Sequence, residues 1–424
     1  MINLESMLRT NSQVTDYKIN IHEIKSYEMF FVKGKLETLR RTNTCDTCVT
    51  VYVSHGEFLG NADFLVYPST TEEALKDLIS KAAERASLID NKPYSLPAGG
   101  PEDCTVDSNF AKLRPEELAA KVANTVFDAN SLPNGSLNSV EIFLNQHHET
   151  VVNSRGLRKS QTRYDAMVEA IPTYNGSIQS VELYKQYNFS NLDEKALYQE
   201  IADIMQAVQA RYEAVKPQQK LDCKVILNKK ELRELFFSIS RNLRYSSVFN
   251  HSTVFKKGDD VQKNPTGDLI SITMAGALEG NVCSAKFDSD GLSLGTQRIV
   301  EDGKALAYFG DNQYGQYLGE KPTGSLRCLH AATGSLSQKA LLEGPYLEII
   351  FMSGLQVDFF SDYIGGEVRL AYYHDGQKII PVTGISVSGS VSDVLSSIRF
   401  SETEATQDGY TGPEKAMLTG MKIF

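Results

Sequence analysis

The sequence predicts an α+β protein, with layered α/β units in the N-terminal half and a β-rich C-terminal domain that is sandwich-like or barrel-like. Two observations lead to this fold class. Between residues 17 and 67 apolar and polar residues alternate, which is typical of half-buried strands. From residue 222 onward, short apolar segments are separated by glycine-containing turns, which is typical of all-β domains. Amphipathic helices are expected mainly in the first half.

A first α+β unit is expected over residues 1–90. A short helix at residues 3–10 precedes strands that are separated by predicted turns at residues 33–34, 43 and 55–56. A helix then begins after Pro68, with a capping Ser/Thr segment, an acidic first turn and an apolar face that includes Leu75 and Ile79. Residues 91–113 are rich in Pro and Gly and are predicted to be a linker or a long surface loop.

A central α+β unit is expected over residues 114–217, with the C-terminal domain following at residues 218–424. The central unit begins with a helix near Pro115, continues with strands, and ends with a long helix from Asn191 or Asp193 to about Val215. The C-terminal domain begins with a strand at residues 224–228 and a helix from Lys229 to about residue 243. Later, residues 372–377 predict a hairpin with Asp-Gly at its tip.

Composition narrows the possible partners and the compartment. The chain has 424 residues, is 41% hydrophobic and 23% charged, and carries a formal net charge of −10. Its two basic clusters, at residues 40–41 and 155–163, are short, so we expect no nucleic acid as the main partner. The N-terminus lacks the apolar region of a signal peptide, no segment approaches the ~18 apolar residues of a membrane span, and the six cysteines are scattered. We therefore expect a cytoplasmic protein.

Two short motifs raise the question of a metal site. The His147-His148-Glu149 segment lacks the second His that a zinc peptidase needs one helical turn further along. Its flanking β-forming residues instead favour a strand, with His147 and His148 on opposite faces. Cys45 and Cys48 have C-x-x-C spacing, but they precede a strand segment and no second ligand pair follows. A chance pair at a strand start is favoured, and a metal or redox role stays open.

Several motifs, in their order along the chain, resemble those of the TldD/PmbA family, once called modulators of DNA gyrase. The resemblance covers essentially the whole chain. The segments that carry it are Asn153-Ser154-Arg155-Gly156 within residues 152–157, residues 287–291 (FDSDG), residues 299–309 (IVEDGKALAYF), Phe360-Ser361 with Gly365-Gly366, and residues 368–395.

The resemblance implies two types of subunit. One carries His-Glu-x-x-x-His on the helix that opens the C-terminal domain, together with a late Cys, and holds a catalytic zinc. The other, the PmbA or TldE type, lacks these ligands and pairs with the first. In this chain the motif positions are occupied by Phe237, Ser238 and Asn242, and the last cysteine is Cys328. The resemblance therefore implies a TldE-type subunit that binds no metal itself, with zinc on its partner.

The expected function is a share in the peptide-binding chamber of a TldD/TldE-type zinc metallopeptidase, in a heterodimer with a TldD-like subunit. The family is one of metallopeptidases, but this chain lacks the zinc ligands and is expected to be inactive alone. Extended, unfolded peptides would bind at strand edges, and the candidate contacts are Phe360, Ser361, Asp362, Tyr363, Gly365 and Gly366.

Two alternatives remain open. One is a homodimeric peptide- or protein-binding module without protease activity. The other is an autonomous metal hydrolase with ligands drawn from His251, His330, His374, Asp288, Asp290 and Asp362. A serine hydrolase built on Ser154 or Ser361 is disfavoured, because no G-x-S-x-G segment is present.

Overall fold

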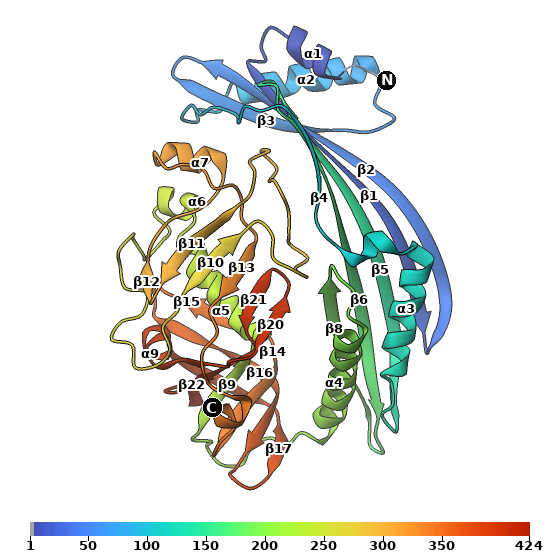
Figure 1. Ribbon diagram of the computed structural model, residues 1–424, viewed down its shortest axis with the longest axis vertical. Coiled ribbons are helices and arrows are strands. Elements are labelled where there is room, and N and C mark those ends of the chain that lie inside the picture. The colour runs from blue at the N-terminus through green and yellow to red at the C-terminus, as the bar shows by residue number, and fades with distance from the viewer. Residues whose placement is uncertain (1–3) are drawn as a thin grey trace.

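One long, curved sheet organises the N-terminal half of the computed structural model, which describes residues 4–424 (Figure 1). Its strand order is β3-β2-β1-β5-β6-β4, and two further short strands, β7 and β8, pair with β6. The strands are β1 (Asp16–Val32), β2 (Lys35–His55), β3 (Phe58–Val66), β4 (Pro101–Thr105), β5 (Gly135–Asn153), β6 (Arg158–Asn175), β7 (Ser180–Glu182) and β8 (Lys185–Phe189). The antiparallel pairing of β1 with β5 places the units expected at residues 1–90 and 114–217 in this single sheet.

The segment expected as a linker, residues 91–113, adds structure to this half. Its strand β4 pairs in parallel with β6, and a short 3₁₀ helix, η1 (Asn109–Lys112), follows. The turn expected at Asn43 is absent, because β2 continues through this position and pairs with β1 along nearly its whole length. The expected turns at residues 33–34 and 55–56 are present between strands.

Four helices pack on this sheet: α1 (Leu4–Thr10), α2 (Glu72–Ala86), α3 (Pro115–Asp128) and α4 (Glu194–Glu213). The helix expected at residues 3–10 is thus present as α1, and Asn3 lies outside the described residues. Side-chain caps fix the starts of two helices, since Thr71 accepts a hydrogen bond from the Ala74 amide and Asp193 accepts from Lys195 and Ala196. Helices α1 and α2 lie at one end of the sheet and α3 and α4 at the other (Figure 1), so the sheet has two separate apolar cores.

The C-terminal domain contains two sheets around one core, which confirms the predicted β-rich domain. The first sheet has the order β12-β11-β10-β13-β21-β20 and the second β19-β22-β9-β14-β16-β18-β23, with β15 and β17 also paired to β16. The helix α5 (Lys229–Arg241) contributes Leu232, Leu235, Phe236 and Ile239 to the core that both sheets share. The expected hairpin at residues 372–377 is confirmed by the pairing of β16 with β17 and by Gly376, whose φ is +101°.

The remaining elements of this domain are short. They are β9 (Lys224–Asn228), α6 (Tyr245–Phe249), β10 (Ile272–Ala275), β11 (Thr296–Glu301), β12 (Lys304–Ala305), α7 (Asn312–Tyr317), β13 (Cys328–Ala331), α8 (Gln338–Leu341), β14 (Tyr346–Met352), β15 (Gln356–Asp358), β16 (Tyr363–His374), β17 (Ile379–Val382), β18 (Ile385–Ser390), α9 (Val391–Ser397), β19 (Arg399–Phe400), β20 (Glu404–Gln407), β21 (Tyr410–Pro413), β22 (Lys415–Leu418) and β23 (Lys422–Ile423).

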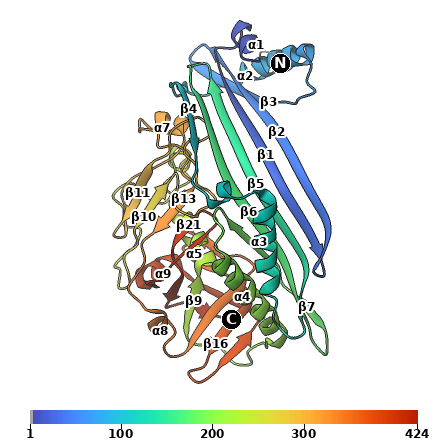
Figure 2. The same cartoon turned by 45° about the vertical axis from the view of Figure 1, so that its right-hand side comes forward.

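Helix α4 lies between the two halves (Figures 1 and 2). Leu197, Ile201 and Met205 face the N-terminal core, whereas Ile204 and Ala207 pack with Leu370 of β16 in a separate cluster. The helix therefore connects the N-terminal sheet to the C-terminal domain through apolar packing. Among the described residues, no helix is both long and apolar enough to cross a membrane.

Candidate functional site

A cleft of about 330 Å³ lies between the N-terminal sheet and the C-terminal domain. Strands β1, β5 and β6 provide one wall, and the loops that precede β11 and β13 provide the other. The polar and reactive side chains that line it are Asn20, His22, Glu149, Gln161, Arg163, Cys283, Asp288, Ser289 and Arg327. Sheet and domain thus meet at a cavity of the size that small ligands or single peptide side chains occupy.

Gln161 of β6 joins the two walls of the cleft. Its Nε2 donates to Glu149 Oε2 at 2.7 Å and to the Phe287 carbonyl at 3.3 Å, and its Oε1 accepts from the Lys286 amide at 2.8 Å. The side chain is almost fully buried, so each of these bonds is shielded from water. A salt bridge of 2.5 Å between Lys18 and Asp290 adds a charged contact beside it.

A chain of hydrogen-bonded side chains runs along the sheet wall, from His22 to Glu149. His22 Nε2 lies 3.0 Å from His147 Nδ1, and His147 Nε2 lies 2.6 Å from Asp165 Oδ2. Arg163 then bridges Asp165, at 3.2 Å, and Glu149, at 3.0 Å. Because the register pairs His22 with Glu149 and His147 with Arg163, all five side chains share one face of the sheet.

The charges in this chain are set by their neighbours. Burial acts to raise the pKa of Glu149, but Arg163 and Gln161 outweigh it and lower that pKa below its usual value. The pKa of Asp165 is likewise lowered, against the effect of burial, by the His147 hydrogen bond. Burial lowers the pKa of His22. If His147 Nε2 donates to Asp165, its Nδ1 accepts from His22 Nε2.

The opposite wall of the cleft is a tight turn organised by Asp288. Its carboxylate accepts hydrogen bonds from the amides of Asp290 and Leu292, each at 3.0 Å, and from the Ser325 amide at 2.9 Å. Burial and the nearby Asp290 raise the pKa of Asp288. Its acceptor sites are used by the backbone, so Asp288 maintains the loop and does not present a free carboxylate to the cleft.

Helix α5 lies directly behind this cleft. A β-carbon placed on Gly409 would lie 3.2 Å from Cys283 Sγ and 3.5 Å from Phe237 Cζ, so the half-buried Phe237 ring adjoins the cleft residue Cys283. Ser238 Oγ donates to the Glu234 carbonyl at 2.7 Å. Asn242 ends the helix, and its side chain bonds the Ser238 carbonyl and the Val254 amide.

Comparison with known proteins identifies the second half of the chain. Residues 220–423 match the model of the PmbA/TldA metallopeptidase C-terminal domain. This segment is therefore similar to a PmbA/TldA metallopeptidase C-terminal domain. No curated protein sequence matches the chain.

The whole fold is shared with solved PmbA/TldD-type structures. TldE from Thermococcus kodakarensis superposes with a TM-score of 0.80 at 15% identity, covering 99% of both chains. Two proteins described as candidate modulators of DNA gyrase are also similar. The one from Thermotoga maritima has a TM-score of 0.77 at 14% identity, covering 99% of this chain and 98% of its own. The one from Bacteroides thetaiotaomicron has 0.80 at 12%, covering 99% and 97%.

Two of the PmbA/TldD-like motifs contact each other. In the β5–β6 turn, Asn153 Oδ1 accepts from the Arg155 amide at 2.9 Å, and Ser154 Oγ donates to Asp16 Oδ1 at 2.5 Å. Leu157, which follows Gly156, is buried against Phe287. Gly291 has a φ of +81°, and a β-carbon there would lie 2.6 Å from Leu157 Cδ2. These motifs therefore join the sheet to the C-terminal domain at the end of the cleft.

The residues considered as metal ligands do not gather. His330 pairs with Glu404 at 3.1 Å, His374 bonds the Gly344 carbonyl at 3.0 Å, and His251 lies just beyond α6. Within residues 4–424 no group of three or more His, Cys, Asp or Glu side chains is placed to hold a metal ion.

The cysteine pair lies elsewhere than expected. Cys45 and Cys48 lie within β2 and not at a strand start, because β2 pairs with β1 on both sides of them. Being three residues apart on one strand, the two thiols point to opposite faces and do not form a joint site.

The peptide-contact candidates lie at the corner between β15 and β16 and in the first residues of β16, and none of them lines the cleft. Phe360 is 70% exposed and Tyr363 is 37% exposed. Asp362 is engaged locally, since its carboxylate accepts from Ser390 Oγ at 2.6 Å and from the Ser392 amide at 2.8 Å at the start of α9. Gly365 and Gly366 lie within β16, where added β-carbons would collide with backbone oxygens.

Sequence reasoning missed most of the cleft. His147 and His148 do point to opposite faces, as expected, because His148 bonds Thr162 while His147 joins His22 and Asp165. The polar residues 145–150 between apolar residues of β5 were the one sequence pattern that could have pointed to this cleft. His22 and Cys283 belong to no recognisable motif. Their roles depend on the pairing of β1 with β5 and on the docking of the C-terminal domain.

Proposed function

We propose that this chain is the non-catalytic, TldE-type subunit of a TldD/TldE-type zinc metallopeptidase, and that it forms part of the chamber that holds peptides for processing or degradation. The observation that carries this proposal is the chemistry of α5. Phe237 offers no ligand atom, and the side chains of Ser238 and Asn242 are bonded within the helix or to its neighbours. A catalytic zinc needs about three protein ligands and a water, so the metal would belong to a TldD-like partner.

Two further features support this assignment. The likeness to Thermococcus TldE extends over the full length of the chain, which suits a subunit of the same kind. The cleft beside α5 has a wall of polar side chains from one face of the sheet, and these side chains can hydrogen-bond to a bound peptide.

The test is affinity purification of the full-length chain from its native cells, with quantitative mass spectrometry and native mass measurement. We expect a similar-sized chain bearing His-Glu-x-x-x-His at equal stoichiometry. The reconstituted pair should cleave an unfolded peptide and contain one zinc, whereas neither chain alone should cleave. Recovery of this chain only with itself, or cleavage by this chain alone, would overturn the proposal.

Phe360 and Tyr363 are the proposed peptide contacts on this chain, because their rings are the exposed apolar groups of the candidate corner. In the reconstituted pair, Phe360→Ala should raise KM several-fold with little change in kcat or melting temperature. Ile379→Ala, which removes an exposed apolar side chain from the same sheet, is the matched control and should change neither. An unchanged KM for Phe360→Ala would exclude this corner as a peptide contact.

One observation favours a second candidate, a homodimeric binding module without protease activity. Strand β3 pairs only with residues 47–55 of β2, and among the described strands none covers the outer edge of β2 at residues 35–46. Leu36 and Leu39 on this segment are about half exposed. A free strand edge of this kind accepts a further strand. A stable homodimer that a charge-introducing Leu39→Glu substitution dissociates, with no partner recovered from cells, would favour this candidate.

A further inference from the structure

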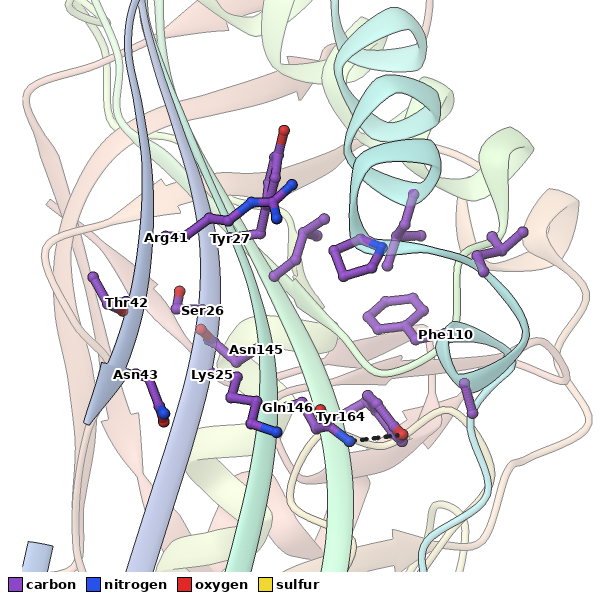
Figure 3. Close-up of a pocket in the computed structure, with 15 residues that line it drawn as sticks. Lys25, Ser26, Tyr27, Arg41, Thr42, Asn43, Phe110, Asn145, Gln146 and Tyr164 are labelled. Atoms are coloured by element: carbon purple, nitrogen blue, oxygen red, sulfur yellow. Dashed lines mark hydrogen bonds between the residues drawn. The ribbon is translucent and has the colours of Figure 1, made fainter. Parts of the chain in front are cut away.

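We propose that a pocket beneath the start of α3 binds a small amphipathic carboxylate, such as a medium-chain fatty acid. The cavity measures about 390 Å³, within the usual range of ligand pockets, and its wall is mostly apolar (Figure 3). It is separate from the interdomain cleft. Lys25 in the pocket follows His22 of the cleft by three residues on β1, so the two side chains point to opposite faces of the sheet. The inference does not depend on the proposed function.

The pocket exists because helices cover this face of the sheet incompletely. Helix α2 packs on one end of the face and α3 on the other, with separate apolar cores. Helix α3 begins only at Pro115, and η1 leads into it at an angle across the sheet (Figures 2 and 3). The space left between them is open to solvent on one side.

One end of the pocket is apolar. Tyr27 and Leu144, which are paired across β1 and β5, form its base, and Phe110, Leu113 and Leu118 lie opposite them. Apart from Leu113, these side chains are almost completely packed in the N-terminal core, so their positions are fixed. This end matches a hydrocarbon chain or ring, whose transfer from water is favourable by about 25 cal/mol per Å² buried.

The other end presents hydrogen-bond donors. Asn43, Lys25, Gln146 and Tyr164 form one cross-strand row over four strands. Lys25 is exposed, and no carboxylate among the described residues forms an ion pair with its ammonium group. Gln146 Nε2 donates to Tyr164 Oη at 3.2 Å, which leaves the phenolic hydrogen free to donate. An ionised carboxylate accepts hydrogen bonds and donates none, so it complements this row.

The second cation at the pocket does not compete for this role. Arg41 already pairs with Glu116, and its guanidinium lies 5.1 Å from the Tyr27 ring centroid. Figure 3 shows Arg41 beside Tyr27, at a distance from the Lys25, Gln146 and Tyr164 group. The ligand therefore has one anionic group, at Lys25, and an apolar body that extends beneath η1 and α3.

The test is isothermal titration calorimetry of the full-length chain with decanoate, and with decylamine as a probe of equal length and opposite charge. We expect saturable one-site binding of decanoate and none of decylamine. Lys25→Gln should weaken decanoate binding at least tenfold, and Tyr164→Phe should weaken it several-fold. Lys33→Gln, at the exposed β1–β2 turn outside the pocket, is the matched control and should leave it unchanged.

Three outcomes would overturn the proposal. Decanoate that does not saturate, or that binds no better than decylamine, would exclude a carboxylate site. Unchanged affinity in Lys25→Gln, with melting temperature also unchanged, would exclude the donor row. Tighter binding of a short peptide with a free C-terminal leucine, lost in its C-terminal amide, would assign the pocket to a peptide terminus and not to a small acid.

Discussion

Glu231 shows how a residue that looks ordinary in sequence acquires an unusual environment. From sequence it is an acidic residue in the first turn of a helix, where the helix dipole favours negative charge. In the structure it is almost fully buried, and its Oε2 has no hydrogen-bond partner. Strand β9 leads directly into α5, which places this first turn inside the domain. Burial raises the pKa of Glu231 to about 7, so the burial penalty exceeds the dipole effect.

A pH-dependent stability difference follows for Glu231→Gln. Between pH ~4.5 and ~7 the native state holds a proton that the unfolded state has released, so the free energy of unfolding of the wild type falls as pH rises. The variant has no carboxyl to ionise at this position. Its free energy of unfolding, relative to that of the wild type, should therefore increase by about 1–3 kcal/mol from pH 5 to pH 8. Denaturant unfolding at both pH values measures the gain, and any constant effect of the amide cancels in the comparison.

The control for this prediction is Glu234→Gln. Glu234 lies in the same helix but is more exposed and pairs with Arg233, so this variant removes a carboxylate from α5 without touching the buried site. An equal stability difference between Glu231→Gln and wild type at pH 5 and pH 8 would show that the carboxyl is already ionised in the fold.

At the scale of elements, helix positions were the most predictable feature. Pro115 and Asp193 mark the starts of α3 and α4 as expected, because capping and first-turn chemistry are local. The extent of β2 was not predictable, since Asn43 favours a turn locally and only pairing with the distant β1 keeps the strand extended. The same holds for the contact between the two motif turns, which joins Leu157 to Phe287 and Gly291.

The contact between Leu157 and Gly291 predicts that two glycine substitutions lower the free energy of unfolding by unequal amounts. Gly280 and Gly291 both have positive φ, but a β-carbon at Gly280 meets nothing within 4 Å, whereas at Gly291 it meets the buried Leu157. Gly280→Ala should cost about 1 kcal/mol of stability through backbone strain alone. Gly291→Ala should cost about 2–4 kcal/mol, because steric overlap is added. Denaturant unfolding compares them.

The double variant Leu157→Ala with Gly291→Ala separates the cost of backbone strain from the cost of steric overlap. Removing the leucine side chain should relieve the overlap, so the second substitution should then cost about as much as Gly280→Ala. Equal costs for the two single glycine variants would mean that the turn shifts away from Leu157 without penalty.

Helix α5 also carries a prediction about metal content. Because the side chains at its motif positions are apolar or already bonded, the purified chain should contain far less than one zinc per molecule after dialysis, by elemental mass spectrometry. Cys45→Ser should leave this content unchanged. One tightly held zinc, lost on substitution of His330 or His374, would instead support an autonomous metal hydrolase.

At the scale of the whole molecule, the sequence predicted the fold class and the order of elements, but not how the halves meet. The cleft combines residues near positions 20, 150–163, 283–294 and 327, and no local pattern relates these segments. Their proximity depends on the β1–β5 pairing and on α4, which contributes one face to each half. Of the motif segments, residues 287–289 line the cleft and the others do not, and the geometry of the cleft came only from long-range packing.

The position of α4 predicts that both halves unfold together. Ile201 is buried in the N-terminal core and Ile204 in the cluster with β16. Alanine at either site should lower the free energy of unfolding by about 2–4 kcal/mol. Calorimetry should show one transition, and both variants should lower its midpoint temperature. Tyr198→Ala, at a 40% exposed position on this helix, should change it little. Two transitions, only one of them moved by Ile201→Ala, would mean that the halves unfold separately. The packing of α4 against both halves would then be too weak to couple their unfolding.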